Sequence, residues 1–179
     1  MIMTLIIMKY LASPALLSIL FATLIVSTAN AGNYPILTQY RDAAQALVTA
    51  TESAQTQADL LVLQDGTREL MSLGAEIVKL YGEKNPACTE QFTVFLAEMP
   101  QMETMTLDQA KRRYHDGLGL PAAPRHCYFG RSQVIHPALN LIRIRNSYTD
   151  RLRSQVSADF EEVIEHLERI EQNLDNPPN

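Results

Sequence analysis

The amino-acid sequence predicts an all-α fold: an antiparallel four-helix bundle with a short accessory helix and an irregular crossover loop tethered by a disulfide. Apolar residues recur at intervals of three and four over most of residues 36–174, which is the spacing of helices with one buried face. No stretch shows the alternation and turn residues of a β-hairpin. The one long interruption, residues 111–137, contains Cys127, which a bond to Cys88 would tether.

The first 31 residues have the pattern of a cleaved secretory signal. Lys9 precedes an apolar core at residues 15–26, and small residues in A-x-A order follow it. We place the cut after Ala31. The protein is therefore expected to be exported, to the periplasm or the extracellular space.

Two alternatives remain open at this end of the chain. Met8 directly precedes Lys9 and could be the true start in place of Met1. An uncleaved membrane anchor is the other alternative, since about 20 apolar residues span a bilayer; Pro14 and the small residues at the cut argue against it. After cleavage we expect one helical-bundle domain, residues 32–179, without a membrane span.

The first half of this domain is expected to hold two long helices. Apolar and small residues follow helical spacing through residues 36–64, and a second stripe covers residues 70–81. Asp65-Gly66 between them predicts a hinge, which would make the two helices an antiparallel hairpin. A single bent helix through this point is the alternative.

Two helix starts follow. Asn85-Pro86 is typical of a helix N-terminus, with a cap residue before proline. Thr106 and Gln109 have the spacing of a capping box, which predicts a short accessory helix from Leu107 to about His115.

The C-terminal part returns to helical periodicity at Val134 and keeps it to Leu174. It is expected to be one helix of about 40 residues or two helices separated near residues 154–157. Pro137 fits the first turn of this helix or a kink just after it.

Two cysteines in an exported chain most simply form one disulfide, Cys88 with Cys127. In the chain-entropy model it would stabilise the fold by roughly 3–4 kcal/mol. The alternative is a reactive or metal-binding Cys127, which only the neighbouring His126 favours.

Residues 111–137 also contain three of the four histidines. His115, His126 and His136, with Asp116, could converge near the disulfide on zinc, copper or iron, including haem iron, and leave an open position. Alternatively, the histidines cap helices and bond loop carbonyls, or they make a pH-responsive contact. No cofactor is specified by the sequence.

Basic charge concentrates in residues 111–153, with nine basic and two acidic residues in a chain of net charge −5. One interpretation is a basic face for an anionic ligand or protein partner; its residues would be Arg125, Arg131, Arg143 and Arg145. The other is that this block packs against the acidic segments on either side. Because the chain is acidic overall, nucleic acid is not expected as a partner.

Several familiar sites are missing from the sequence: Cys-x-x-Cys, Cys-x-x-Cys-His, a glycine-rich phosphate loop and a Gly-x-Ser-x-Gly elbow. Residues 162–166 resemble a metalloprotease helix but lack its first histidine, and Val163 breaks the spacing of di-iron bundles. We therefore expect their acidic face to be solvated.

The leading functional hypothesis is a small exported binding or adaptor module without catalytic residues. A metal- or haem-binding protein that uses His115, His126 and His136 is the alternative. A hydrolase-like enzyme centred on His115 and Asp116 is a weaker one, because no nucleophile is placed beside them by the sequence.

Overall fold

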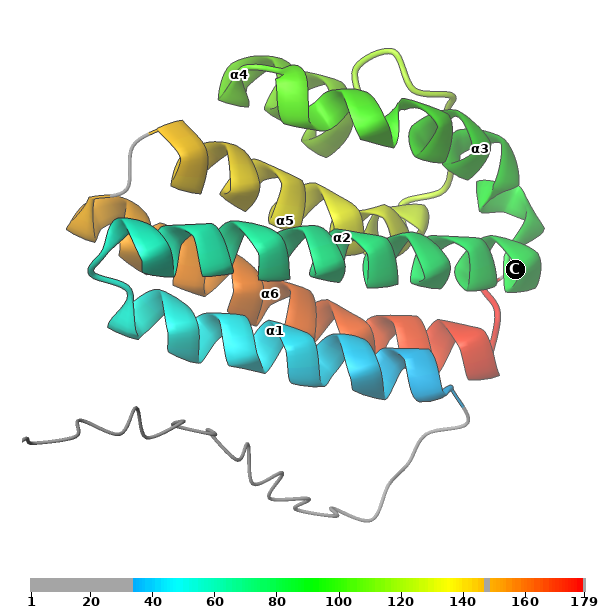
Figure 1. Cartoon of the computed structure of the whole chain (residues 1–179). Coiled ribbons are helices and arrows are strands. Elements are labelled where there is room, and N and C mark those ends of the chain that lie inside the picture. Colours follow the sequence, from blue (N-terminus) through cyan, green and yellow to red (C-terminus); the bar gives the residue numbers. More distant parts are fainter. Residues whose placement is uncertain (1–33, 147–148, 179) are drawn as a thin grey trace, which may run out of the picture.

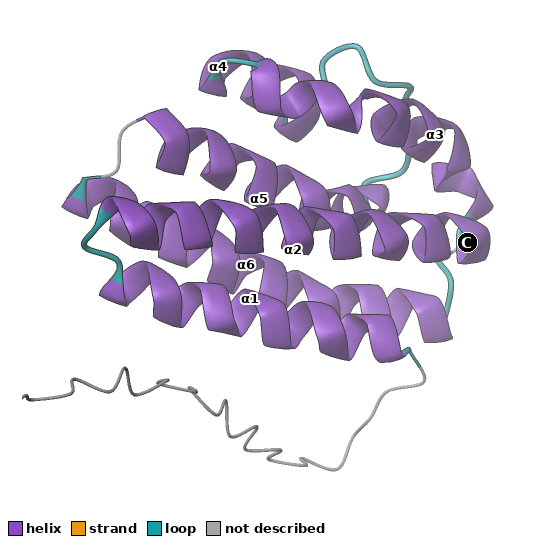
Figure 2. Cartoon of the chain, viewed as in Figure 1, coloured by secondary structure: helices purple, strands orange, loops and turns teal. Residues whose placement is uncertain are grey.

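The computed structural model describes residues 34–146 and 149–178. The signal peptide expected at residues 1–31, its cut and the choice between Met1 and Met8 lie outside these residues. Within them every regular element is a helix, so the all-α prediction is confirmed (Figure 2).

Four long helices account for most of the chain, and shorter elements connect them. In chain order the elements are α1 (Pro35–Ser53), α2 (Gln57–Lys84), a 3-10 turn η1 (Pro86–Cys88), α3 (Thr89–Glu98), a second 3-10 segment η2 (Met99–Thr104), α4 (Leu107–Ala110), a π-helical turn η3 (Lys111–His115), α5 (Cys127–Asn146) and α6 (Asp150–Asp175).

The long helices pack side by side. α1 contacts α2 and α6, and α5 contacts the same two helices (Figure 1). The short elements α4, η2 and η3 also contact α5, on the side of the molecule that carries α3 and α4 in Figure 1. α5 is therefore enclosed, and all its residues from Gly130 to Ile144 are buried.

The predicted hinge at Asp65-Gly66 is wrong, because α2 continues through it. The chain turns instead at residues 54–56, where Thr56 and Asp59 form a capping box. The Thr56 hydroxyl accepts from the Asp59 N–H at 3.2 Å, and the Asp59 carboxylate accepts from the Thr56 N–H at 2.7 Å. This reciprocal cap satisfies N–H groups at the start of α2, which Asp65-Gly66 would not do.

Two glycines of α2 serve close helix packing. A Cβ on Gly66 would lie 2.9 Å from Cδ2 of Leu47 on α1. A Cβ on Gly74 would lie far inside contact distance of the Gln133 carbonyl oxygen on α5. Both helices therefore approach α2 where it has no side chain.

Pro137 lies in the interior of α5, because this helix begins at Cys127 and not near Val134 as predicted. Proline has no N–H, so the Gln133 carbonyl four residues earlier lacks its usual helical donor. The Tyr40 hydroxyl of α1 donates to that carbonyl at 2.8 Å. A long-range hydrogen bond thus replaces the one that Pro137 removes.

The predicted position of the boundary between the last two helices is also wrong. It lies before Asp150 and not near residues 154–157. Thr149 caps α6, and its hydroxyl accepts from the Leu152 N–H at 3.4 Å.

Two of the predicted helix starts are confirmed by the structure, as is the predicted disulfide. η1 and α3 follow Asn85-Pro86, and Thr106 and Gln109 form the expected capping box of α4. The Cys88–Cys127 disulfide is confirmed, with a Cα–Cα distance of 5.5 Å, and joins η1 to the start of α5.

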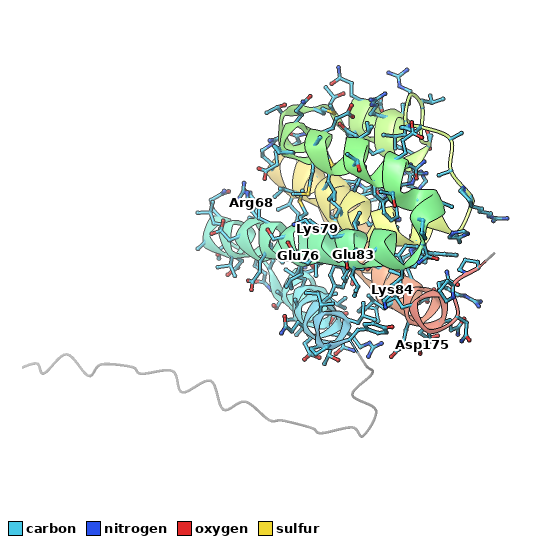
Figure 3. The ribbon with its side chains drawn as sticks, turned by 90° about the vertical axis from the view of Figure 1, so that its right-hand side faces the viewer. Arg68, Glu76, Lys79, Glu83, Lys84 and Asp175 are labelled. Carbon is cyan, nitrogen blue, oxygen red and sulfur yellow. A yellow bond between two sulfur atoms is a disulfide. The ribbon has the colours of Figure 1, made fainter. Side chains whose placement is uncertain are left out.

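The outer face of α2 is polar. Figure 3 shows Arg68, Glu76, Lys79, Glu83 and Lys84 along this helix, with Lys79 and Glu76 paired at 2.8 Å. Within the described residues, no helix combines the length and apolar character needed to cross a membrane.

The glycine contacts predict different effects for two otherwise similar substitutions. Gly74→Ala should lower the free energy of unfolding by about 1–3 kcal/mol, because the new methyl group meets backbone that cannot easily move. Gly66→Ala is the matched control: its methyl group meets the flexible end of Leu47, and alanine favours the helix by about 1 kcal/mol. Urea denaturation of both variants checks this, and equal destabilisation would contradict it.

Candidate metal centre

A stripe of polar side chains runs along the buried helix α5. Ser132, His136, Asn140 and Arg143 recur at intervals of four, four and three residues, so they share one face. This face contacts α6, which presents Asp159, Glu162 and His166 to it. The interface between α5 and α6 is therefore polar although it is largely buried.

His136 is the most enclosed of the imidazoles in this interface, with 4% of its surface exposed. Its Nε2 lies 3.0 Å from the Tyr128 hydroxyl. Its Nδ1 is buried, has no hydrogen-bond partner and lies 3.5 Å from Oε2 of Glu162. One ring nitrogen is thus held by Tyr128, and the other faces a carboxylate without bonding to it.

The surroundings of His136 keep its ring neutral. Burial, together with the positive charge that His166, His115 and Arg143 carry or can acquire, lowers the pKa of His136 to about 3. The 3.5 Å approach of Glu162 is therefore not an ion pair at neutral pH. A neutral imidazole is the form that binds metal ions.

Ser132 contacts one ring nitrogen of His166. The Ser132 hydroxyl lies 2.8 Å from the Phe129 carbonyl, to which it can donate, and 3.0 Å from Nδ1 of His166. When the hydroxyl donates to the carbonyl, Nδ1 of His166 carries the proton and donates to the hydroxyl. This leaves a lone pair on Nε2, and burial lowers the pKa of His166, which also favours the neutral ring.

Glu162 lies between the two imidazoles. Its Oε1 is 3.8 Å from Nε2 of His166, and its Oε2 is 3.5 Å from Nδ1 of His136. One ligand atom from each of the three residues, His136, Glu162 and His166, lies within 4.8 Å of the other two. Ligands about 2 Å from a tetrahedral ion lie about 3.3 Å apart, so only a small contraction would be needed to hold one.

Two further groups border this cluster. His115, from η3, has its ring centroid 5.7 Å from that of His136, and its Nδ1 lies 3.0 Å from Oδ1 of Asp116. Burial and the nearby carboxylates, first that of Glu162, raise the pKa of Tyr128 to about 12, so this phenol stays protonated.

Arg143, about two turns after His136 on α5, forms an ion pair with Asp159, which lies about one turn before Glu162 on α6. Arg143 also donates to Oδ1 of Asn140 at 2.8 Å. Its positive charge is thus matched within the interface, so Arg143 does not require Glu162 as a partner.

The structure brings together only part of the ligand set expected from the sequence. His115, Asp116 and His136 lie in one region, but His126 does not group with them. His126 lies beside the disulfide, with its ring centroid 6.4 Å from that of Tyr81. Because Cys88 and Cys127 are bonded to each other, their sulfurs are not available there as thiolate ligands.

Glu162 and His166 were missed, because the sequence placed them on a solvated acidic face. The acidic neighbours Glu161 and Glu165 are exposed as expected, and Glu162 is partly exposed, but the side chain of His166 is largely buried and contacts α5. The i,i+4 spacing of Glu162 and His166 was a signal that both point the same way. This spacing indicates a site only together with the tertiary structure, which puts His136 of α5 next to Glu162.

The expected basic face is not a continuous surface. Arg131 and Arg143 are buried, and only Arg125 and Arg145 are exposed. Arg145 donates to the Glu103 carbonyl, and Arg143 pairs with Asp159. Burial and these contacts mean that the four arginines do not form one docking surface.

No protein-family model, curated protein or solved structure matches this chain. The class of protein must therefore be argued from the fold and the site.

The pKa of His136 predicts that acid destabilises the protein. The imidazole has a pKa of 6.5 in the unfolded chain and about 3 in the folded protein, so below pH 6.5 protons bind preferentially to the unfolded chain. This stabilising contribution is complete above about pH 6.5 and is lost as the pH falls toward 3, at up to about 1.4 kcal/mol per pH unit. His136→Gln should remove this part of the slope when urea denaturation is repeated from about pH 7 to pH 4.

Other groups of the interface titrate in both proteins, so the comparison isolates His136. The lowered pKa of His166 acts in the same direction, whereas the raised pKa values of Asp159 and Glu162 act in the opposite one. Parallel stability curves for the two proteins would contradict the prediction.

Proposed function

We propose that this protein binds one divalent transition-metal ion between α5 and α6, through His136, Glu162 and His166. The observation that carries the proposal is the approach of three ligand atoms to within 4.8 Å of one another. Two are imidazole nitrogens whose surroundings favour the neutral form, and the third is a carboxylate oxygen. Such a set occurs in metal centres.

Neighbouring groups would orient both imidazoles for binding. Ser132 holds Nδ1 of His166, which directs the Nε2 lone pair toward Glu162. The Tyr128 hydroxyl can accept from Nε2–H of His136, which frees the Nδ1 lone pair. Outer contacts of this kind commonly set the tautomer of metal-binding histidines.

Zinc is the ion that this set suits best. Two imidazoles and one carboxylate are a known combination for zinc sites that keep a fourth position open. Imidazole also suits copper, iron and nickel, whereas calcium and magnesium prefer sites made of oxygen. His115, at the border of the cluster, is the side chain best placed to approach the open position.

This function corresponds to the metal-binding alternative of the sequence, with Glu162 and His166 in place of Asp116 and His126. We prefer it to the adaptor function, because Arg131 and Arg143 of the expected basic docking face are buried. We assign no catalytic residue.

We also propose that the four long helices form an antiparallel four-helix bundle and that the protein is exported. The contacts of α1 with α2 and α6, and of α5 with the same two helices, support the bundle. The signal-like residues 1–31 and the disulfide support export to an oxidising compartment.

Zinc binding can be tested on chelator-treated protein with its disulfide intact. We expect calorimetric titration with Zn²⁺ to show one ion per chain and Co²⁺ to give visible absorption bands. His166→Gln and Glu162→Gln should each weaken binding about tenfold or more, since each removes a ligand. At 100 times its Kd, the ion should raise the free energy of unfolding by about 2.7 kcal/mol.

His126→Gln is the matched control, because it removes a histidine outside the cluster. It should bind Zn²⁺ like the wild type. The proposal is wrong if wild-type protein binds no ion, or if the variant that combines His166→Gln with Glu162→Gln binds as tightly as the wild type.

A further inference from the structure

Tyr128 also lines a cavity of about 270 Å³. Its lining comes from α3, from the loop before α5 and from the first turns of α5: Gln91, Ala123, Pro124, Arg125, Tyr128 and Arg131. The cavity is the size of a small molecule or ion, and two of its six lining residues are arginines.

Arg131 is buried without a matching negative charge. Only 9% of its surface is exposed, and the structure pairs no carboxylate among the described residues with its guanidinium. Nη1 donates to the Tyr114 carbonyl at 2.8 Å, and the guanidinium carbon lies 5.4 Å from the centroid of the Tyr128 ring. Nε is buried and has no hydrogen-bond partner.

A buried cation that lacks a counter-ion is costly, because a carbonyl and an aromatic face replace only part of its hydration. The pKa of Arg131 is correspondingly lowered by burial, although the group stays charged at neutral pH. An anion in the cavity, which Arg131 lines, would relieve this cost.

The backbone nearby is shaped to admit the guanidinium. Gly117 has a φ of 76°, which other residues rarely adopt, and a Cβ there would lie 3.2 Å from Nη1 of Arg131. The glycine thus leaves room for the guanidinium, and the Tyr114 carbonyl accepts a hydrogen bond from it.

Arg125 supplies the second positive charge. It lines the same cavity, is exposed and precedes α5 by two residues. The first N–H groups of α5 are already used, since those of Cys127 and Tyr128 donate to the carbonyls of Pro124 and Arg125. Recognition of a ligand would therefore depend on the two arginine side chains.

We propose that this cavity binds a small oxoanion, a carboxylate or a phosphate, between Arg131 and Arg125. Guanidinium groups recognise both anions through paired N–H donors. The site does not depend on the metal centre, although the Tyr128 hydroxyl contacts His136 and so connects the two.

The test uses chelator-treated full-length protein, so that no metal ion can bind the anion. Sodium phosphate and sodium acetate are titrated separately at constant ionic strength, while nitrogen NMR follows the Nε–H signal of Arg131. We expect this signal to shift and saturate with at least one of the two anions. Saturation with only one of them supports the site and identifies the ligand class.

Variants distinguish a site from general charge effects. Arg125→Gln should weaken anion binding about tenfold, and its exposed position makes loss of folding improbable as a cause. Arg131→Lys keeps the charge but loses the paired donors, so it should weaken binding at least as much. Arg151→Gln is the matched control, because it removes the same charge from an exposed position at the start of α6.

Two results would overturn the proposal. One is the absence of a saturable shift with either anion. The other is an equal loss of affinity in Arg125→Gln and Arg151→Gln, which would show that net charge alone attracts the anions.

Discussion

The burial of α5 on all sides is the constraint from which the other features follow. α2 and α6 pack against it, and the short elements between α3 and the crossover loop cover the remaining side. The helix nevertheless carries Ser132, His136, Asn140 and Arg143 on one face. Each of these must find a partner within the protein, because a buried polar group without one costs about 1–3 kcal/mol. Asn140 and Arg143 have partners on α6. The Gln133 carbonyl, which Pro137 deprives of its helical donor, accepts a hydrogen bond from the Tyr40 hydroxyl.

Among the described residues, four side-chain atoms of this helix are buried without a hydrogen-bond partner, and two of them, Nδ1 of His136 and Nε of Arg131, belong to residues of the two proposed sites. Nδ1 of His136 faces Glu162 and His166 without a hydrogen bond, and Arg131 lines a cavity. The same burial makes the imidazole neutral, which suits a cation, and leaves the guanidinium without a counter-ion, which suits an anion. Tyr128 contacts both residues, through its hydroxyl and its ring respectively. The proposed metal ion and oxoanion would therefore bind next to residues that share one tyrosine as a neighbour.

Local sequence signals predicted the helix starts correctly where residues a few positions apart in the sequence determine the start. The Thr106 capping box and the helix start after Asn85-Pro86 are of this kind. The hinge at Asp65-Gly66 failed because glycine is ambiguous: it can end a helix or permit close packing, and here Leu47 occupies the space beside it. The start of α5 was placed too late because Pro137 suggested a first turn. A hydrogen bond from Tyr40, 97 residues before that proline, satisfies the helical carbonyl that the proline leaves without a donor.

The sequence by itself predicted that residues 32–179 form a helical domain and that Cys88 pairs with Cys127. These predictions need only periodicity and the presence of two cysteines. The sequence also named His115, His126 and His136 as residues that could converge, but it did not show which of them would. Tertiary structure alone decided that Glu162 and His166 face His136, that His126 turns toward Tyr81, and that Arg131 is enclosed. The physical reason is that periodicity shows which residues share a helix face but not what packs against it. That partner determines whether a polar face is solvated or becomes a binding site.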